Sequence, residues 1–170
     1  MIDVVMTTIA SAFHGVGNLI EGIFGKQPKK EDLRAQVSSL QQSADQLATV
    51  FQQQREELDR MLLHYHQLKF YQVIQKSELK RQIQEELVCQ YAALDYLTIL
   101  IDAVESGQKM SRADLDFYYT YCKVFADGQI DANEIAELHP FMRQRHAQEL
   151  DALQPCSLDS VLDRLRRYRK

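Results

Sequence analysis

The feature that most constrains this chain is a stretch of roughly eighty residues between Pro28 and Gly107 that contains neither glycine nor proline, the two residues that cost most in a helix interior. Gln, Glu, Leu, Lys and Ala crowd the stretch instead, and these residues cost least there. The composition predicts a very long helical region, which we place at 31–106.

Apolar residues in the first part of this region recur at alternating steps of three and four, the spacing of a coiled-coil seam. Gln54 is the polar exception on the seam. The seam consists of Leu33, Val37, Leu40, Ala44, Leu47, Phe51, Leu58, Met61, Tyr65 and Leu68. Such a stripe must be covered, either by another chain or by a folded-back helix. We therefore predict that the seam serves as an oligomer interface.

The apolar pattern changes after Tyr71. Heptad spacing would place Gln72 and Gln75 on the seam, whereas the apolar residues that follow adopt the period of a straight helix. They are Leu79, Ile83, Leu87, Tyr91 and Leu94. This drift predicts a stutter or a helix break between Tyr71 and Leu79. Nearly every face is apolar over 92–104, so we expect other helices to surround that segment.

Local helix signals continue beyond Gly107, in the part of the chain that we expect to form a small helical bundle, 107–170. Pro140 lies in a helix predicted to start at Ala132, and it predicts a kink or a boundary there. Pro155 and the nearby Ser157 open a final short helix. No segment alternates at period two, so we predict an all-α fold. It would be a long coiled-coil helix or helical hairpin with the small bundle at its C-terminal end.

We predict that residues 1–25 form an apolar amphipathic helix, followed by a basic hinge at 26–30. The stripe consists of Ile2, Val5, Ile9, Phe13, Val16, Ile20 and Ile23, and the hinge carries Lys26, Lys29 and Lys30. These residues suit attachment to an anionic membrane surface, and packing into the protein's own bundle or into an oligomer is the alternative. The uncharged run from Val4 to Ile20 is short for a membrane span and contains polar residues, which disfavours spanning.

One acidic turn of the sequence reproduces the residue pattern of the second half of a calcium-binding EF-hand loop. Its candidate metal ligands are Asp127, Asp131 and Glu134. Lys123 and Phe125 occupy the places of the opening carboxylates, which removes two ligands and adds a positive charge. The alternative is a tight corner between two helices, in which Gly128 takes positive φ and Asp131 caps the second helix.

The segment 119–138 carries aromatic residues, then Phe-Ala-Asp-Gly-x-Ile-Asp, then Glu-Ile-Ala-Glu-Leu. It resembles the central helix pair of the TerB-like family of tellurite-resistance-associated helical domains. The resemblance implies an all-helical bundle whose acidic turn residues sit near a metal. It also implies a link to membrane-associated stress or defence systems.

No catalytic motif such as HExxH, GxSxG or the di-iron ExxH is present, so we expect no catalytic residues, no cofactor and no enzyme activity. The net charge of -4 argues against nucleic acid as a partner. Three cysteines without a CxxC pair predict reduced, mostly buried thiols, and the first residues lack a basic secretory n-region. We expect a cytoplasmic protein, peripheral at the inner face of a membrane.

These features favour an oligomerising helical scaffold or adaptor whose partners are a second copy, another helical protein and an anionic membrane surface. Two other functions stay open. One is a membrane-disrupting effector that releases its glycine-containing N-terminal helix, and the other is a TerB-like metal-responsive component of stress or defence.

Overall fold

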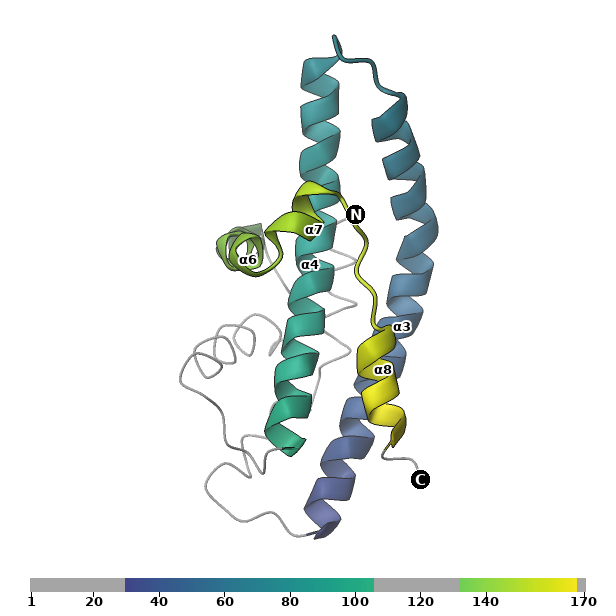
Figure 1. Cartoon of the computed structure of the whole chain (residues 1–170), viewed down its shortest axis with the longest axis vertical. Coiled ribbons are helices and arrows are strands. Elements are labelled where there is room, and N and C mark those ends of the chain that lie inside the picture. Colours follow the sequence, from purple (N-terminus) through teal and green to yellow (C-terminus); the bar gives the residue numbers. More distant parts are fainter. Residues whose placement is uncertain (1–29, 106–131, 168–170) are drawn as a thin grey trace.

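The structure is a computed structural model, and it describes residues 30–105 and 132–167. The described helices are α3 (Lys30–Gln67), α4 (Val73–Glu105), α6 (Ala132–Arg145), α7 (Ala147–Asp151) and α8 (Asp159–Arg166) (Figure 1). These two ranges contain no strand, which confirms the all-α prediction for the described part of the chain.

Helices α3 and α4 run antiparallel and pack along one another as a hairpin (Figure 1). The helical region is therefore interrupted, although it has no glycine or proline at this point. Helix α3 ends at Gln67 and α4 begins at Val73, so the break begins before the window that the apolar pattern predicted, Tyr71 to Leu79. The early end has a local cause, because the side chain of Gln72 closes the turn by accepting a hydrogen bond from the backbone N–H of Lys69 at 2.9 Å.

The seam of α3 lies inside this hairpin. Its central members, Leu40, Ala44, Leu47, Phe51 and Leu58, are buried, while Val37, Met61 and Tyr65 are partly buried and pack against the same core. Leu68 is half-buried in the turn, and the side chain of Leu33 is outside the described set. The folded-back helix α4, together with α8, covers the stripe. This is the second of the two covers that the sequence pattern allowed.

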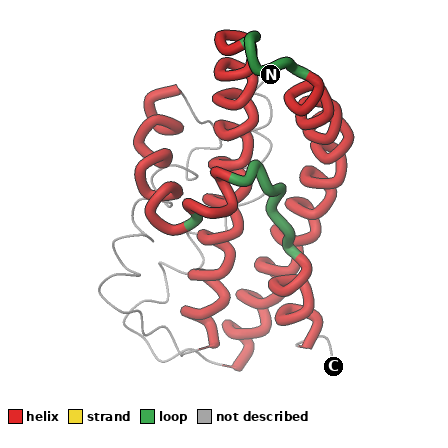
Figure 2. The backbone as a smooth tube through the Cα atoms, turned by 45° about the horizontal axis from the view of Figure 1, so that its top comes forward, coloured by secondary structure: helices red, strands yellow, loops and turns green. Residues whose placement is uncertain are grey.

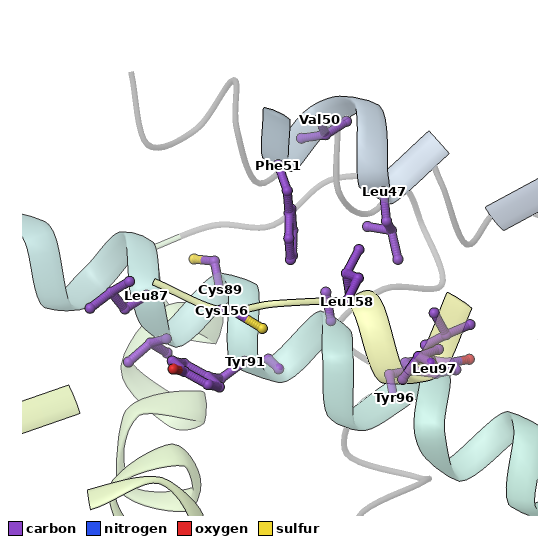
Figure 3. Close-up of a cluster of buried hydrophobic side chains, with 14 of the residues drawn as sticks. Leu47, Val50, Phe51, Leu87, Cys89, Tyr91, Tyr96, Leu97, Cys156 and Leu158 are labelled. Carbon is purple, nitrogen blue, oxygen red and sulfur yellow. The ribbon is translucent and has the colours of Figure 1, made fainter. Parts of the chain in front are cut away.

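The second half of α4 is surrounded, as the apolar run over 92–104 predicted. Helix α3 packs along α4, and α6 and α7 also contact it. The buried members of the run are Ala92, Ala93, Tyr96, Leu97, Ile99, Leu100, Ile101 and Val104. Figure 3 shows Leu47 and Phe51 of α3 pointing towards α4, which carries Tyr91 and Leu97, with Leu158 between the two helices.

Helix α6 continues through Pro140 to Arg145, so of the kink or boundary predicted at Pro140 the structure excludes the boundary. Leu138 and Met142, one on each side of the proline, are both fully buried. Their burial against α4 keeps the chain helical across a residue that lacks a backbone N–H.

A non-helical segment, 152–158, joins α7 beside α4 to α8 beside α3, and we call it the strap (Figure 2). Leu153, Cys156 and Leu158 of the strap are buried. Leu153 is the non-glycine residue in the described ranges with positive φ, 54°, which turns the chain out of α7. The predicted final short helix is confirmed as α8, and its Leu165 carbonyl accepts a hydrogen bond from Gln41 Nε2 of α3 at 3.0 Å.

Candidate interaction surface

Large apolar side chains are exposed at the turn of the α3–α4 hairpin. Those exposed in the described ranges are Leu63 at 59%, Phe70 at 87%, Tyr71 at 64%, Val73 at 62% and Ile74 at 83%. No residue from 59 to 82 is buried, so this end, which we call the hairpin tip, carries no core of its own. The tip extends past α6, α7 and α8 at the top of Figure 1.

The backbone of the tip is a closed turn that places two aromatic residues at its apex. Gln72 donates its N–H to the carbonyl of Lys69 at 2.9 Å, which leaves Phe70 and Tyr71 as the two central residues of a four-residue turn. Their rings meet edge to face, with centroids 5.8 Å apart. Helix α4 then starts with the N–H of Lys76 donating to the carbonyl of Gln72 at 2.9 Å. The apex aromatics are therefore held by a defined turn.

Positive charge surrounds these apolar residues. The sequence has no carboxylate between Asp59 and Glu78, and the cations in that interval are Arg60, Lys69 and Lys76. Lys69 Nζ lies 5.7 Å from the ring centroid of Tyr71. The two flanking carboxylates are paired, Asp59 with Arg55 at 3.0 Å and Glu78 with Arg81. The tip is thus a cationic and apolar end on a chain whose net charge is -4.

A buried ion cluster fastens α4 to the junction of α6 and α7. Asp95, 6% exposed, accepts hydrogen bonds on Oδ2 from Arg145 Nε at 2.8 Å, and its Oδ1 lies 3.0 Å from His146 Nε2. The His146 ring also stacks on Tyr91, with centroids 4.6 Å apart. Tyr91 in turn donates its hydroxyl to the Gln154 carbonyl at 2.9 Å. The cluster connects α4 to the α6–α7 junction and to Gln154, which lie 50 to 63 positions away in sequence.

The residue types Cys156, His146 and Asp95 invite comparison with a nucleophilic triad. Burial, with a smaller effect of the Asp95 charge, raises the pKa of the Cys156 thiol to about 12. An activated cysteine needs the opposite shift, because the thiolate is the nucleophile. The surroundings of Cys156 are those of a structural thiol. Cys89 is buried as well, and Cys122 lies outside the described ranges.

The polar exception on the seam has a buried partner. Gln90 Nε2 of α4 donates to Gln54 Oε1 at 3.1 Å, and Gln90 Oε1 accepts the N–H of Cys156 in the strap at 3.3 Å. This chain of hydrogen bonds ties α3, α4 and the strap in one register. Gln54 Nε2 has no hydrogen-bond partner in the described part of the molecule. The sequence singled out Gln54 but gave no signal for Gln90.

A second polar residue at a seam-type position is Glu86 of α4, which is 6% exposed. Burial, and to a lesser degree the charge of Glu57 on α3, raises the pKa of Glu86 to about 7. The hairpin interface therefore contains a carboxyl group that titrates near neutral pH.

The structure leaves the predicted membrane anchor and the predicted metal site untested. The anchor stripe and the lysines of the hinge fall on residues 1–29, outside the described ranges, and Lys30 begins α3 without a described side chain. Asp127 and Asp131 are also outside those ranges, and Glu134 lies in α6 with its side chain undescribed. Within 30–105 and 132–167, no three His, Cys, Asp or Glu residues are grouped as metal ligands.

The helices in the described part include none long and apolar enough to cross a membrane. His64 and His66, two positions apart in α3, are both exposed near the tip. Comparison of the chain with protein-family models, with curated proteins and with solved structures found no match. The TerB-like resemblance therefore stays a prediction.

Proposed function

We propose that this protein is a non-enzymatic helical scaffold or adaptor that associates with a membrane surface through its N-terminal helix and assembles with copies of itself. The observation that carries the proposal is the division of apolar surface in the hairpin. The seam is closed by α4 and α8, and the exposed large apolar residues of the described part lie at one end. A rod with a closed flank and an apolar end supports binding rather than catalysis.

Membrane association rests on the stripe from Ile2 to Ile23 beside the hinge lysines. Each apolar side chain buried at an interface contributes about 1.5 to 3 kcal/mol, and each lysine near anionic lipid about 1 kcal/mol. Deletion of the residues before Gly25 should markedly weaken flotation with anionic liposomes, and Ile9→Glu with Phe13→Glu should have the same effect. An intact chain that never floats would remove this part of the proposal.

Self-assembly has a route that preserves every seam contact. The turn that joins α3 to α4 contains no glycine or proline, so it can straighten into helix, and α4 of a second copy can then cover the seam. The seam residues would be buried equally in a hairpin monomer and in such an exchanged dimer. Sedimentation of the full chain at several concentrations tests this route, because a concentration-independent monomer excludes it.

Liposome leakage separates this function from the membrane-disrupting effector. An anchored scaffold binds vesicles without releasing trapped dye, whereas an effector releases it. The TerB-like metal-responsive alternative requires tight metal binding at the acidic turn, which calorimetry with calcium tests directly.

A further inference from the structure

The geometry points to a second lipid contact: we propose that the hairpin tip enters the headgroup region of an anionic membrane. This inference extends the peripheral association proposed above to a different part of the chain, and it does not need the N-terminal helix. It assigns a function to Phe70 and Tyr71 at the apex and to the cations Lys69 and Lys76 beside them.

The apex has the reach for this contact. Leu58 is the last buried residue of α3 before the turn, and Ile83 is the first buried residue of α4 after it. At 1.5 Å per residue, the ends of the two helices extend roughly 14 Å beyond these positions. The apolar face of an interfacial element lies about 5 to 10 Å deep in a bilayer. The tip can therefore enter the headgroups while the core of the hairpin remains in water.

The side chains at the tip match the chemistry of that layer. Phe70 and Ile74 are 87% and 83% exposed, and the aromatic and aliphatic groups would leave water on insertion. Tyr71 has an apolar ring with a polar hydroxyl, the combination that favours the membrane–water boundary. The tip therefore combines the apolar side chains of Phe70 and Ile74 with Tyr71, whose ring tolerates partial hydration.

Charge selects an anionic surface. The interval between Asp59 and Glu78 contains Arg60, Lys69 and Lys76 and no acid. Glu78, which ends this interval, is paired with Arg81. A negative lipid surface thus meets cations at the tip, although the chain as a whole carries -4.

The small convex shape favours lipid over a protein partner. The five exposed apolar residues offer a surface on the order of 500 Å². A stable protein interface buries about 800 Å² on each partner and is matched in shape across that area. A fluid headgroup layer needs no matching surface, so a tip of this size can bury its apolar groups there.

A single tryptophan reports on the tip directly, because the native chain has none. The probe is the full chain carrying Phe70→Trp, mixed with vesicles of phosphatidylcholine and phosphatidylserine whose acyl chains are brominated. We expect its emission to shift to the blue and to be quenched, and both changes to weaken in vesicles without phosphatidylserine. Gln53→Trp, at an exposed position of α3 below the tip, is the matched control and should remain unquenched.

Two sets of variants measure the contribution of the tip. Phe70→Ser with Tyr71→Ser should weaken vesicle binding of the full chain at least about tenfold, with unchanged helicity because both side chains are exposed. Lys69→Gln with Lys76→Gln should weaken it about fivefold per lysine at low salt. The same loss of charge at Arg143→Gln with Arg167→Gln, away from the tip, should leave binding unchanged.

A companion reporter, Phe13→Trp, separates this inference from the proposed anchoring of the N-terminal helix. Quenching at position 70 without quenching at 13 supports the tip and removes the N-terminal anchor. Quenching at 13 alone overturns the tip contact. A blue shift at 70 that follows protein concentration without vesicles also overturns it, because the tip would then be covered by a second copy.

Discussion

Replacement of Glu86 by glutamine should stabilise the hairpin at neutral and alkaline pH and leave it nearly unchanged in acid. Glu86 is 6% exposed in the interface of α3 and α4. Burial, and secondarily Glu57, raises its pKa from 4.5 to about 7. Glutamine has the shape and neutrality of the protonated acid, so Glu86→Gln removes the cost of ionisation and little else.

The sign follows from proton binding. Between pH 4.5 and about 7 the folded chain holds a proton on Glu86 that the unfolded chain has released. The contribution of this group to the free energy of unfolding therefore falls as the pH rises through that window and stays low above it. A tenfold change in proton affinity corresponds to about 1.4 kcal/mol. With some residual hydration of the carboxyl, the cost above pH 7 is about 2 to 3 kcal/mol.

Urea unfolding followed by circular dichroism, at about pH 5 and about pH 8, measures this cost. Wild type and Glu86→Gln should be nearly equal in acid, and the variant should be more stable by about 2 to 3 kcal/mol in alkali. Glu56→Gln, the same change at an exposed position of α3, should alter stability by less than about 0.5 kcal/mol at both pH values. A gain for Glu86→Gln of the same size at both pH values, or no gain at pH 8, would refute the reasoning.

Three further outcomes are expected. Leu47→Asp with Leu58→Asp places charges at fully buried positions and should unfold the hairpin or shift sedimentation to a smaller species; a fully helical particle of unchanged size would contradict the seam. Asp95→Asn should lower the free energy of unfolding by about 2 kcal/mol in a denaturant titration, because Arg145 and His146 lose a buried anion, while the exposed Asp102→Asn should cost under about 1 kcal/mol. Asp131→Ala should cost about 1 kcal/mol through a lost helix cap, and calorimetry should find calcium affinity no tighter than millimolar; micromolar binding would instead support the metal-responsive function.

The sequence predicted the helices well where a periodic apolar face packs against another helix. The spacing from Leu40 to Leu58 was sufficient to identify a covered face, and the dense apolar run in α4 identified the core. The sequence could not show whether a helix of the same chain or a second copy of the chain covers this face. Both bury the same side chains, so the pattern of one chain is identical in the two cases.

The position of the turn was harder to predict for a local reason. Turns are usually marked by glycine, proline, asparagine or aspartate, and residues 68–72 contain none of these. The hydrogen bond from Lys69 N–H to the Gln72 side chain closes the turn in place of such residues. A glutamine in a glutamine-rich helical region does not indicate a turn.

The Asp95 cluster was missed because its members are far apart in sequence. Arg145 and His146 lie about fifty positions from Asp95, and neither belongs to an apolar repeat. Only tertiary packing of α6 on α4 brings them together. Gln90, which meets Gln54 and the strap, was missed for the same reason.

The two proposals for this chain compete through the same five residues. The apex of the tip exists because residues 68–72 form a turn, and exchange of α4 between copies would require these residues to become helical. Phe70 and Tyr71 would then lie along the middle of a continuous helix, without the hydrogen bonds that hold the turn. Lipid that binds the tip binds the hairpin form alone, so it must shift the population towards that form.

If both proposals hold, anionic vesicles should lower the fraction of exchanged dimer seen by chemical cross-linking, and Phe70→Ser with Tyr71→Ser should abolish this effect. A dimer fraction that rises with vesicle binding would show that the tip and the exchange are not alternatives.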